Sequence, residues 1–326
     1  MRTNLPLRLS HILTSFPCSL NKPLSRFLLA MAAVLRVSIN PNVLANKMSR
    51  SNPSRPSRTT MAIMSQDHPY WASVHAEIEV HLKQHILVRP PLSVFEPMHH
   101  LVFSAPPSPG PALCVAACEL VGGHRDQAIA AAAALHLMHA AAVIHEQLLS
   151  TDRLKTKPKP RPMVHSPGIE LLTGDGMFAF GYELLAKSMD PAQNNSDRIL
   201  RVIVEMTRAM GSQGMVDGQY HEILMLCKQS RYYKYVCEKK EGGLHACGAA
   251  CGAILGGASE EEIERLRRYG LCVGVMIAFS NRVEERNEME TTEVVKELRS
   301  LALKELEFFH EGKAEAISSF LHLLNL

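Results

Sequence analysis

Four of the eight cysteines form two pairs with the same spacing, Cys114–Cys118 and Cys247–Cys251. On a helix, residues i and i+4 lie on one face, so each pair presents two thiols together. The pattern allows a four-thiolate metal site, close helix packing with cysteine as a small apolar residue, or a docking surface for another helical protein. Because zinc usually takes cysteines from loops, the spacing by itself favours packing, then docking, over metal binding.

The histidines are a second group with possible metal chemistry. His136 and His139 share one helix face, and His145 follows further along the same segment. No aspartate lies nearby, and Glu146 is the one adjacent carboxylate. We therefore expect buried, hydrogen-bonded histidines here rather than a metal site.

Helices must position these residues, because the sequence from about residue 70 has helical periodicity and no alternating strand pattern. Prolines predict loops at 105–111 and 151–167. Ser259 and Glu262 have the spacing of a helix capping box. The prediction is an all-α, single-domain helical bundle over residues 70–326. Its expected helices cover residues 72–87, 112–121, 126–149, 168–189, 196–210, 218–240, 243–255, 259–279 and 290–324.

The composition is that of a globular protein, with 46% hydrophobic and 21% charged residues. It excludes a disordered chain, a fibrous repeat and a small disulfide scaffold. No stretch approaches the roughly 18 consecutive apolar residues of a transmembrane helix, so we expect no membrane span. The cysteine spacing does not fit a secreted disulfide framework, which indicates a reducing compartment.

Residues 1–60 have a different composition from the rest. They contain nine Lys or Arg, thirteen Ser or Thr and no acidic residue, which is typical of an organelle transit peptide. Serine and proline dominance at 48–60 favours a plastid over a mitochondrion, and the alternative is a disordered basic tail that binds nucleic acid or lipid. The remainder has 26 basic and 32 acidic residues, a net charge of about −6 that would repel nucleic acid. We therefore predict a disordered plastid-targeting leader and no nucleic-acid partner.

Five stretches after residue 70 resemble, in family order, the trans-isoprenyl diphosphate synthases, which elongate allylic diphosphates. The resemblance implies the isoprenoid synthase bundle, in which two Asp-rich motifs hold Mg²⁺ ions and the substrate diphosphate. The stretches are 114–123 (CVAACELVGG), 135–148 (LHLMHAAAVIHEQL), 172–185 (LTGDGMFAFGYELL), 210–220 (MGSQGMVDGQY) and 251–269 (CGAILGGASEEEIERLRRY).

The first Asp-rich motif of that family is degenerate in this chain. Glu146, Gln147 and Asp152 stand at its three acidic positions, after His145. Gln147 is neutral, so the chain lacks one carboxylate that the family uses to bind Mg²⁺. Magnesium requires hard oxygen ligands, and the resemblance therefore implies a weakened first motif.

The second Asp-rich motif is degenerate as well. Asn281, Arg282 and Glu285 stand at its positions, and Arg282 places a cation where a metal ion would bind. The family's basic segment for isopentenyl diphosphate falls on 106–111 (PPSPGP), which has no basic residue. Lys240 stands at the lysine of the family's Lys-Thr pair. With this electrostatic stabilisation lost, we expect no catalytic residue and no bound metal in the chain.

Degenerate motifs together with two CxxxC pairs resemble the type II small subunits of plant heterodimeric geranylgeranyl diphosphate synthases, most closely over 242–257 (GGLHACGAACGAILGG). The resemblance implies a plastid regulatory subunit that binds a catalytic large subunit, as heterodimer or heterotetramer, and changes its product length or activity. Mg²⁺ is then expected only in the partner. In that family the CxxxC faces serve subunit association, which raises docking above packing for these residues: Cys114, Cys118, Cys247 and Cys251.

Two other functions stay open from the sequence. One is a weakly active Mg²⁺-dependent prenyltransferase that uses Glu146, Asp152 and Glu285. The other is a scaffold that recruits a downstream isoprenoid enzyme, such as a geranylgeranyl reductase.

Overall fold

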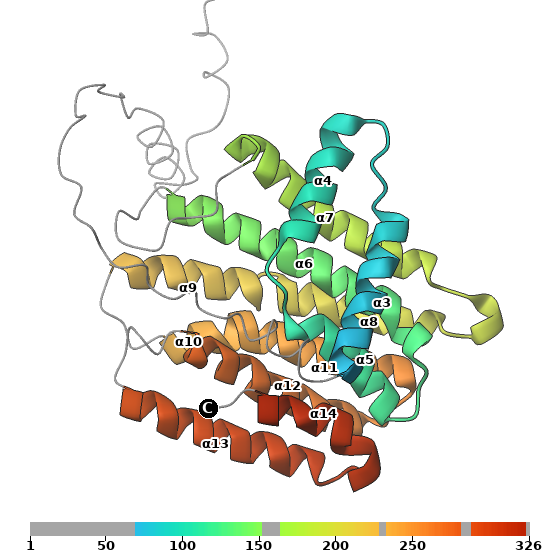
Figure 1. Cartoon of the computed structure of the whole chain (residues 1–326), viewed down its shortest axis with the longest axis vertical. Coiled ribbons are helices and arrows are strands. Elements are labelled where there is room, and N and C mark those ends of the chain that lie inside the picture. The colour runs from blue at the N-terminus through green and yellow to red at the C-terminus, as the bar shows by residue number, and fades with distance from the viewer. Residues whose placement is uncertain (1–68, 152–163, 228–232, 282–287, 324–326) are drawn as a thin grey trace, which may run out of the picture. The chain divides into compact units, whose positions relative to one another are not determined.

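The computed structural model describes residues 69–151, 164–227, 233–281 and 288–323, which confirm the predicted all-α fold (Figure 1). No strand occurs within these ranges. The predicted leader and its boundary with the bundle lie outside them. The α-helices are α3 (Pro69–His85), α4 (Leu92–Ser104), α5 (Pro109–Leu120), α6 (Arg125–Thr151), α7 (Pro167–Lys187), α8 (Ser196–Met210), α9 (Met215–Cys227), α10 (Tyr233–Cys237), α11 (Gly243–Gly256), α12 (Glu260–Ser280), α13 (Glu288–Leu306) and α14 (Glu311–Leu323). A 3₁₀ turn, η1, covers Pro191–Gln193, and a π-helical turn, η2, covers Glu238–Gly242.

Helices α5, α6 and α11 pack together at the centre of the bundle. Most of the other helices contact one of them, whereas α13 packs on α12 and α14. Nearly every side chain of α5 and α11 is buried. The segment Arg125–Leu148 of α6 is long and apolar enough to cross a membrane, but 78% of its apolar 18-residue window is buried inside the bundle. Helices α4 and α5 are long and apolar enough to cross a membrane only if they are counted as one span, and they meet at a bend of 76°. The apolar surface of α6 is therefore used for packing against its neighbouring helices.

Small residues let α11 lie directly on α5. A Cβ added to Gly252 would overlap the carbonyl oxygen of Cys114, and one added to Gly248 would overlap that of Gly110. The backbones thus approach more closely than any larger residue permits. Gly257 ends α11 with a φ of 84°, a left-handed conformation that glycine adopts without strain.

Several element boundaries differ from the predictions. The predicted loop at 105–111 ends early, because Ser108 caps α5 and the helix begins at Pro109. The predicted single helix 290–324 is two helices, separated at residues 307–310. The predicted helix 218–240 is replaced by α9, α10 and η2 in the described residues, and α4 was not predicted. The capping box of Ser259 and Glu262 is confirmed.

We predict that Gly252→Ala lowers the free energy of unfolding by about 3 kcal/mol or more, because the new methyl group must push α11 away from α5. Gly168→Ala is the matched control. Gly168 has no atom near its Cβ position, so alanine there should be neutral or stabilising by up to about 1 kcal/mol. Urea unfolding followed by circular dichroism measures both, and equal stabilities of the two variants would contradict the close contact.

Candidate functional site

One pocket, here called the motif pocket, brings the two degenerate motifs together. Glu146 from α6 and Asn281 from the end of α12 both line it, and its volume is about 160 Å³. These two positions, which the resemblance assigns to the two Asp-rich motifs, line the same pocket. The other lining residues are Glu222, Tyr233, Val236, Cys237, Lys240, Glu241 and Ala278.

Lys240 is the basic side chain among the lining residues of the motif pocket, which also include three glutamates. Its Nζ lies 3.0 Å from Oε2 of Glu146 and 2.6 Å from Oε2 of Glu222, and the residue is only 8% exposed. Burial by itself lowers the pKa of Lys240, but the charges of Glu146 and Glu222 outweigh burial and raise it. The ammonium group therefore stays charged and joins three elements: α6, α9 and η2.

Two local features let α9 approach η2 and α6. Gly218 lies against Lys240, and a Cβ there would come within 2.8 Å of Lys240 Cγ. Gln219 Nε2 donates a hydrogen bond to the carbonyl oxygen of Ala142 on α6, at 3.3 Å. Glu222 follows one turn later and so reaches the ammonium group. Glu222 was not predicted from the sequence. Its position one helical turn after Gly218 is the signal that could have identified it.

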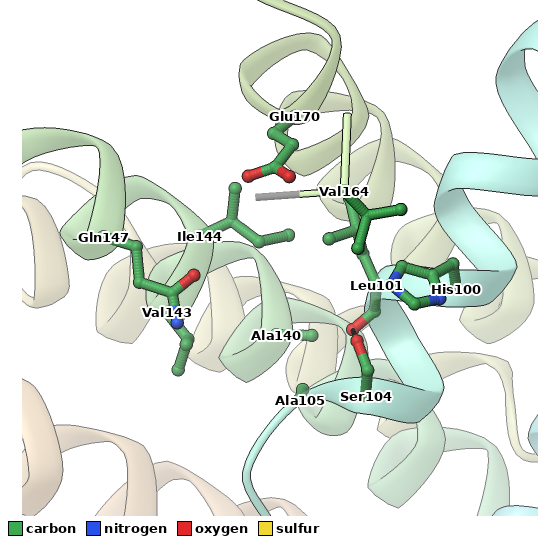
Figure 2. A pocket seen from close by; sticks show the side chains of 10 residues that line it. All are labelled: His100, Leu101, Ser104, Ala105, Ala140, Val143, Ile144, Gln147, Val164 and Glu170. Carbon is green, nitrogen blue, oxygen red and sulfur yellow. Dashed lines mark hydrogen bonds between the residues drawn. The ribbon is translucent and has the colours of Figure 1, made fainter. Parts of the chain in front are cut away.

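Gln147 does not point into the motif pocket. Consecutive helix residues are rotated by about 100°, and Gln147 instead lines a small pocket between α4, α6 and α7. Figure 2 shows Gln147 on one side of this pocket, His100 and Ser104 on the other, and the buried carboxylate of Glu170 above Ile144. Its accessible space, about 20 Å³, suits a single water molecule.

The described residues do not fit the Mg²⁺ that the family resemblance implies for an active synthase. The carboxylate of Glu146 already pairs with an ammonium group, Gln147 lies in another pocket, and Asn281 carries no charge. Magnesium prefers charged carboxylate oxygens in near-octahedral geometry. Asp152, Arg282 and Glu285, the other motif positions, lie outside the described residues.

All four CxxxC cysteines are buried inside the bundle, with exposures of 2% or less. Cys118 Sγ donates to the carbonyl oxygen of His124 at 3.4 Å, and the thiols of Cys247 and Cys251 lie 3.7 Å apart. Within the described ranges, no three His, Cys, Asp or Glu side chains gather as a metal site would require. The prediction that these cysteines serve partner binding stays a prediction. Such a role must act through the packing of α5 and α11.

Two of the three predicted histidines are hydrogen-bonded, as the sequence predicted, whereas His145 places Nε2 3.4 Å from Oδ1 of Asp175. His136 Nε2 donates to the carbonyl oxygen of Val102 at 3.2 Å, and His139 Nε2 donates to that of Pro106 at 2.9 Å. These bonds fasten α6 to the end of α4 and to the segment 106–111. Pro106 starts the segment that lacks the family's basic residues.

Helices α7, α8 and α9 expose a set of large apolar side chains that the sequence analysis missed. Thr207 Oγ1 donates to the hydroxyl oxygen of Tyr182 at 3.1 Å and links α7 to α8 on their solvent-exposed side. Helix α8 has two apolar stripes. One, with Ile199 and Val202, is buried, and the other, with Leu200 and Val204, is exposed. The outer apolar side chains, 45% to 71% exposed, are Leu172, Leu200, Val204, Val216, Tyr220 and Leu224.

Residues 95–279 match the family model described as polyprenyl synthetase. The chain is 50% identical over 263 residues to the chloroplastic heterodimeric geranylgeranyl pyrophosphate synthase small subunit 2 of Cannabis sativa, covering 77% of this chain and 90% of that protein.

Two solved structures are similar throughout the bundle. One is the geranyl diphosphate synthase small subunit of Antirrhinum majus, with a TM-score of 0.71, 52% identity, and coverage of 79% of this chain and 99% of that chain. The other comes from a heterotetrameric geranyl pyrophosphate synthase of mint, with a TM-score of 0.69, 48% identity, and coverage of 78% and 99%.

We predict that acid destabilises the bundle through its buried histidines. Burial lowers the pKa of His75 to about 4 and that of His136 to about 4, against about 6.5 in the unfolded chain. Between these values the unfolded state binds more protons, so stability is present above pH 6.5 and is lost as the pH falls. From pH 7 to pH 5, the free energy of unfolding should decrease by about 4 kcal/mol from this pair.

Urea unfolding at several pH values measures this slope. His75→Gln and His136→Gln should each flatten it. An unchanged slope in both variants would contradict the assignment to these histidines.

Proposed function

The chain belongs to the polyprenyl synthetase family, and we propose that it is the non-catalytic small subunit of a heterodimeric plastid prenyl diphosphate synthase. Relatives about half identical to it are small subunits of such enzymes, and it spans nearly their full length. The chloroplastic Cannabis relative agrees with the predicted plastid location. The proposed partner is a catalytic large subunit, in a heterodimer or heterotetramer.

The neutral side chain of Asn281, which lines the motif pocket together with Glu146, is the observation that carries the non-catalytic part of the proposal. A prenyl synthase must gather Mg²⁺ and a diphosphate between its two motifs. Here the first-motif carboxylate is bound by an ammonium group, and the facing Asn281 is neutral. Ionisation of an allylic diphosphate depends on that electrostatic stabilisation, so this pocket would not provide it.

The exposed apolar side chains of α7, α8 and α9 support the proposal that the chain binds a partner subunit. Large apolar side chains exposed on neighbouring helices of a folded chain favour an interaction surface. Val204 lies in the middle of α8 and is 47% exposed, whereas Ile199 and Val202 on the inner side are buried. A helical partner would cover this outer stripe.

Helix α8 also has a charge polarity that suits a related partner. Asp197 lies in its first turn and Arg208 in its last, both exposed. Arg208 lies eleven positions after Asp197, which is close to three helical turns, and Val204 lies seven positions after Asp197, close to two turns. All three side chains therefore lie on the same side of α8. An antiparallel helix with the same polarity would bring acid against base at both ends. The partner in this proposal is therefore a homologous chain whose own α8-like helix runs antiparallel.

Such an interface would let the subunit change the partner's products without contributing a catalytic residue. Binding shifts a partner's conformational equilibrium only through contacts that differ between its states. Repacking of the partner's helices at the interface could alter the depth of its chain-length pocket. In this proposal, such repacking causes the predicted change in the partner's product length or rate.

We predict that the chain alone incorporates no labelled isopentenyl diphosphate, with dimethylallyl diphosphate and Mg²⁺ present. Mixed with a plastid large subunit, it should change the product ratio or the rate. Thin-layer analysis of the labelled products measures both. Turnover by the chain alone would disprove the non-catalytic part, and an unaltered partner would disprove the regulatory part.

We predict that Val204→Arg weakens binding to the large subunit by about tenfold to a hundredfold, since it places a charge in the centre of an apolar interface. Val80→Arg is the matched control, because Val80 is 53% exposed on α3, outside the proposed interface. Isothermal titration calorimetry compares the two. Equal affinities would place the interface elsewhere.

A further inference from the structure

The outer side of α8 carries two charged and two apolar side chains in a symmetric order. Asp197 lies in the first turn and Arg208 in the last, with Leu200 and Val204 between them. All four are exposed, Leu200 by 53% and Val204 by 47%. Because each helical residue is rotated by about 100° from the one before, these side chains lie within a sector of about 80°. They therefore form one stripe along the helix, here called the α8 stripe.

The charges of the α8 stripe are not used within the bundle. Arg201 and Glu205, two other charged side chains of α8, pair with residues of α12 at 2.5 Å and 2.7 Å. Asp197 and Arg208, in contrast, form no ion pair with any residue that the structure describes. The stripe thus offers one acid and one base to a molecule that binds from outside.

A second copy of the chain would fit the α8 stripe if its own α8 ran antiparallel. Asp197 of each copy would then lie opposite Arg208 of the other, since a two-fold axis relates the two helices. The axis would pass between positions 202 and 203, so the same register would bring Leu200 of each copy beside Val204 of the other. One register therefore forms two ion pairs at the ends and two apolar contacts at the centre.

Charge fixes the direction of this pairing. Parallel helices would place Asp197 against Asp197 and Arg208 against Arg208, and like charges across an interface disfavour the pairing. Exposed ion pairs contribute little affinity by themselves. The affinity would come from covering Leu200 and Val204, and the ion pairs would select the antiparallel register.

We propose that the chain pairs with a second copy of itself through antiparallel α8 helices when no large subunit is bound. This pairing covers the apolar residues that a free subunit would otherwise expose to water. The large subunit of the proposed function would bind the same face, so the two pairings exclude each other. Self-pairing then controls how much of the chain is free to bind the large subunit, and this regulatory step alone rests on the proposed function.

Sedimentation equilibrium of the full chain, without a large subunit and over a range of concentrations, tests the pairing. The parent should form dimers, and Val204→Arg should be monomeric. Asp197→Arg and Arg208→Asp should each weaken self-association by about tenfold or more, because like charges then meet at both ends. An equimolar mixture of these two variants should associate as tightly as the parent, because every arginine then meets an aspartate.

Glu297→Arg is the matched control, because Glu297 is an exposed acid on α13, outside the α8 stripe, and its reversal should leave self-association unchanged. Asp197→Lys and Arg208→Glu are a second complementary pair, should either first variant fold poorly. Three results would overturn the proposal: a parent that is monomeric throughout, single reversals that associate as tightly as the parent, or a mixture that associates no more tightly than the single reversals.

Adding the large subunit to the parent tests the regulatory step, and it should convert homodimers into heterodimers. A chain that pairs with itself but binds no large subunit would disprove the proposed function and leave self-pairing intact. A chain that binds the large subunit but never pairs with itself would disprove self-pairing and leave the proposed function intact.

Discussion

An ammonium group held between two carboxylates determines what the central pocket of this bundle can do. The π-helical turn η2 brings Lys240 to Glu222 on α9, where Gly218 leaves room for the lysine, and to Glu146 on α6. The residue that the family would use to bind metal thereby becomes part of an internal ion pair. The fold of the family is retained, and the neutral Asn281 lines this pocket together with Glu146.

The bundle uses small residues inside, and large apolar side chains are exposed on several of its helices. Glycines on α11 and alanines on α6 allow the central helices to approach closely, and the cysteine pairs fill the same interior. Helices α7 to α9 instead expose leucine, valine and tyrosine side chains. A stable interior together with an uncovered apolar face is the arrangement expected of a subunit that works in an assembly.

Much of the fold could be predicted from the sequence, because helical periodicity and caps are local signals. Helix α8 and the capping box of Ser259 were predicted at the correct residues, and the motif positions 146 and 281 do share one pocket. Helix α4 was missed because Pro97 lies within it, and the break at 307–310 was missed because it contains neither glycine nor proline. The pairing of Lys240 with Glu222 depends on how α9 approaches η2. The different directions of Glu146 and Gln147 depend on how α6 is rotated in the bundle, and neither feature is local.

A crystal structure of the chain bound to its large subunit, grown with Mn²⁺ and an allylic diphosphate analogue, tests the central claim most directly. Anomalous scattering locates manganese in both subunits of the same crystal, so the partner serves as the internal control. The account predicts manganese peaks in the large subunit alone, with Lys240 still paired to Glu146 in this chain. A manganese peak on Glu146 would contradict it.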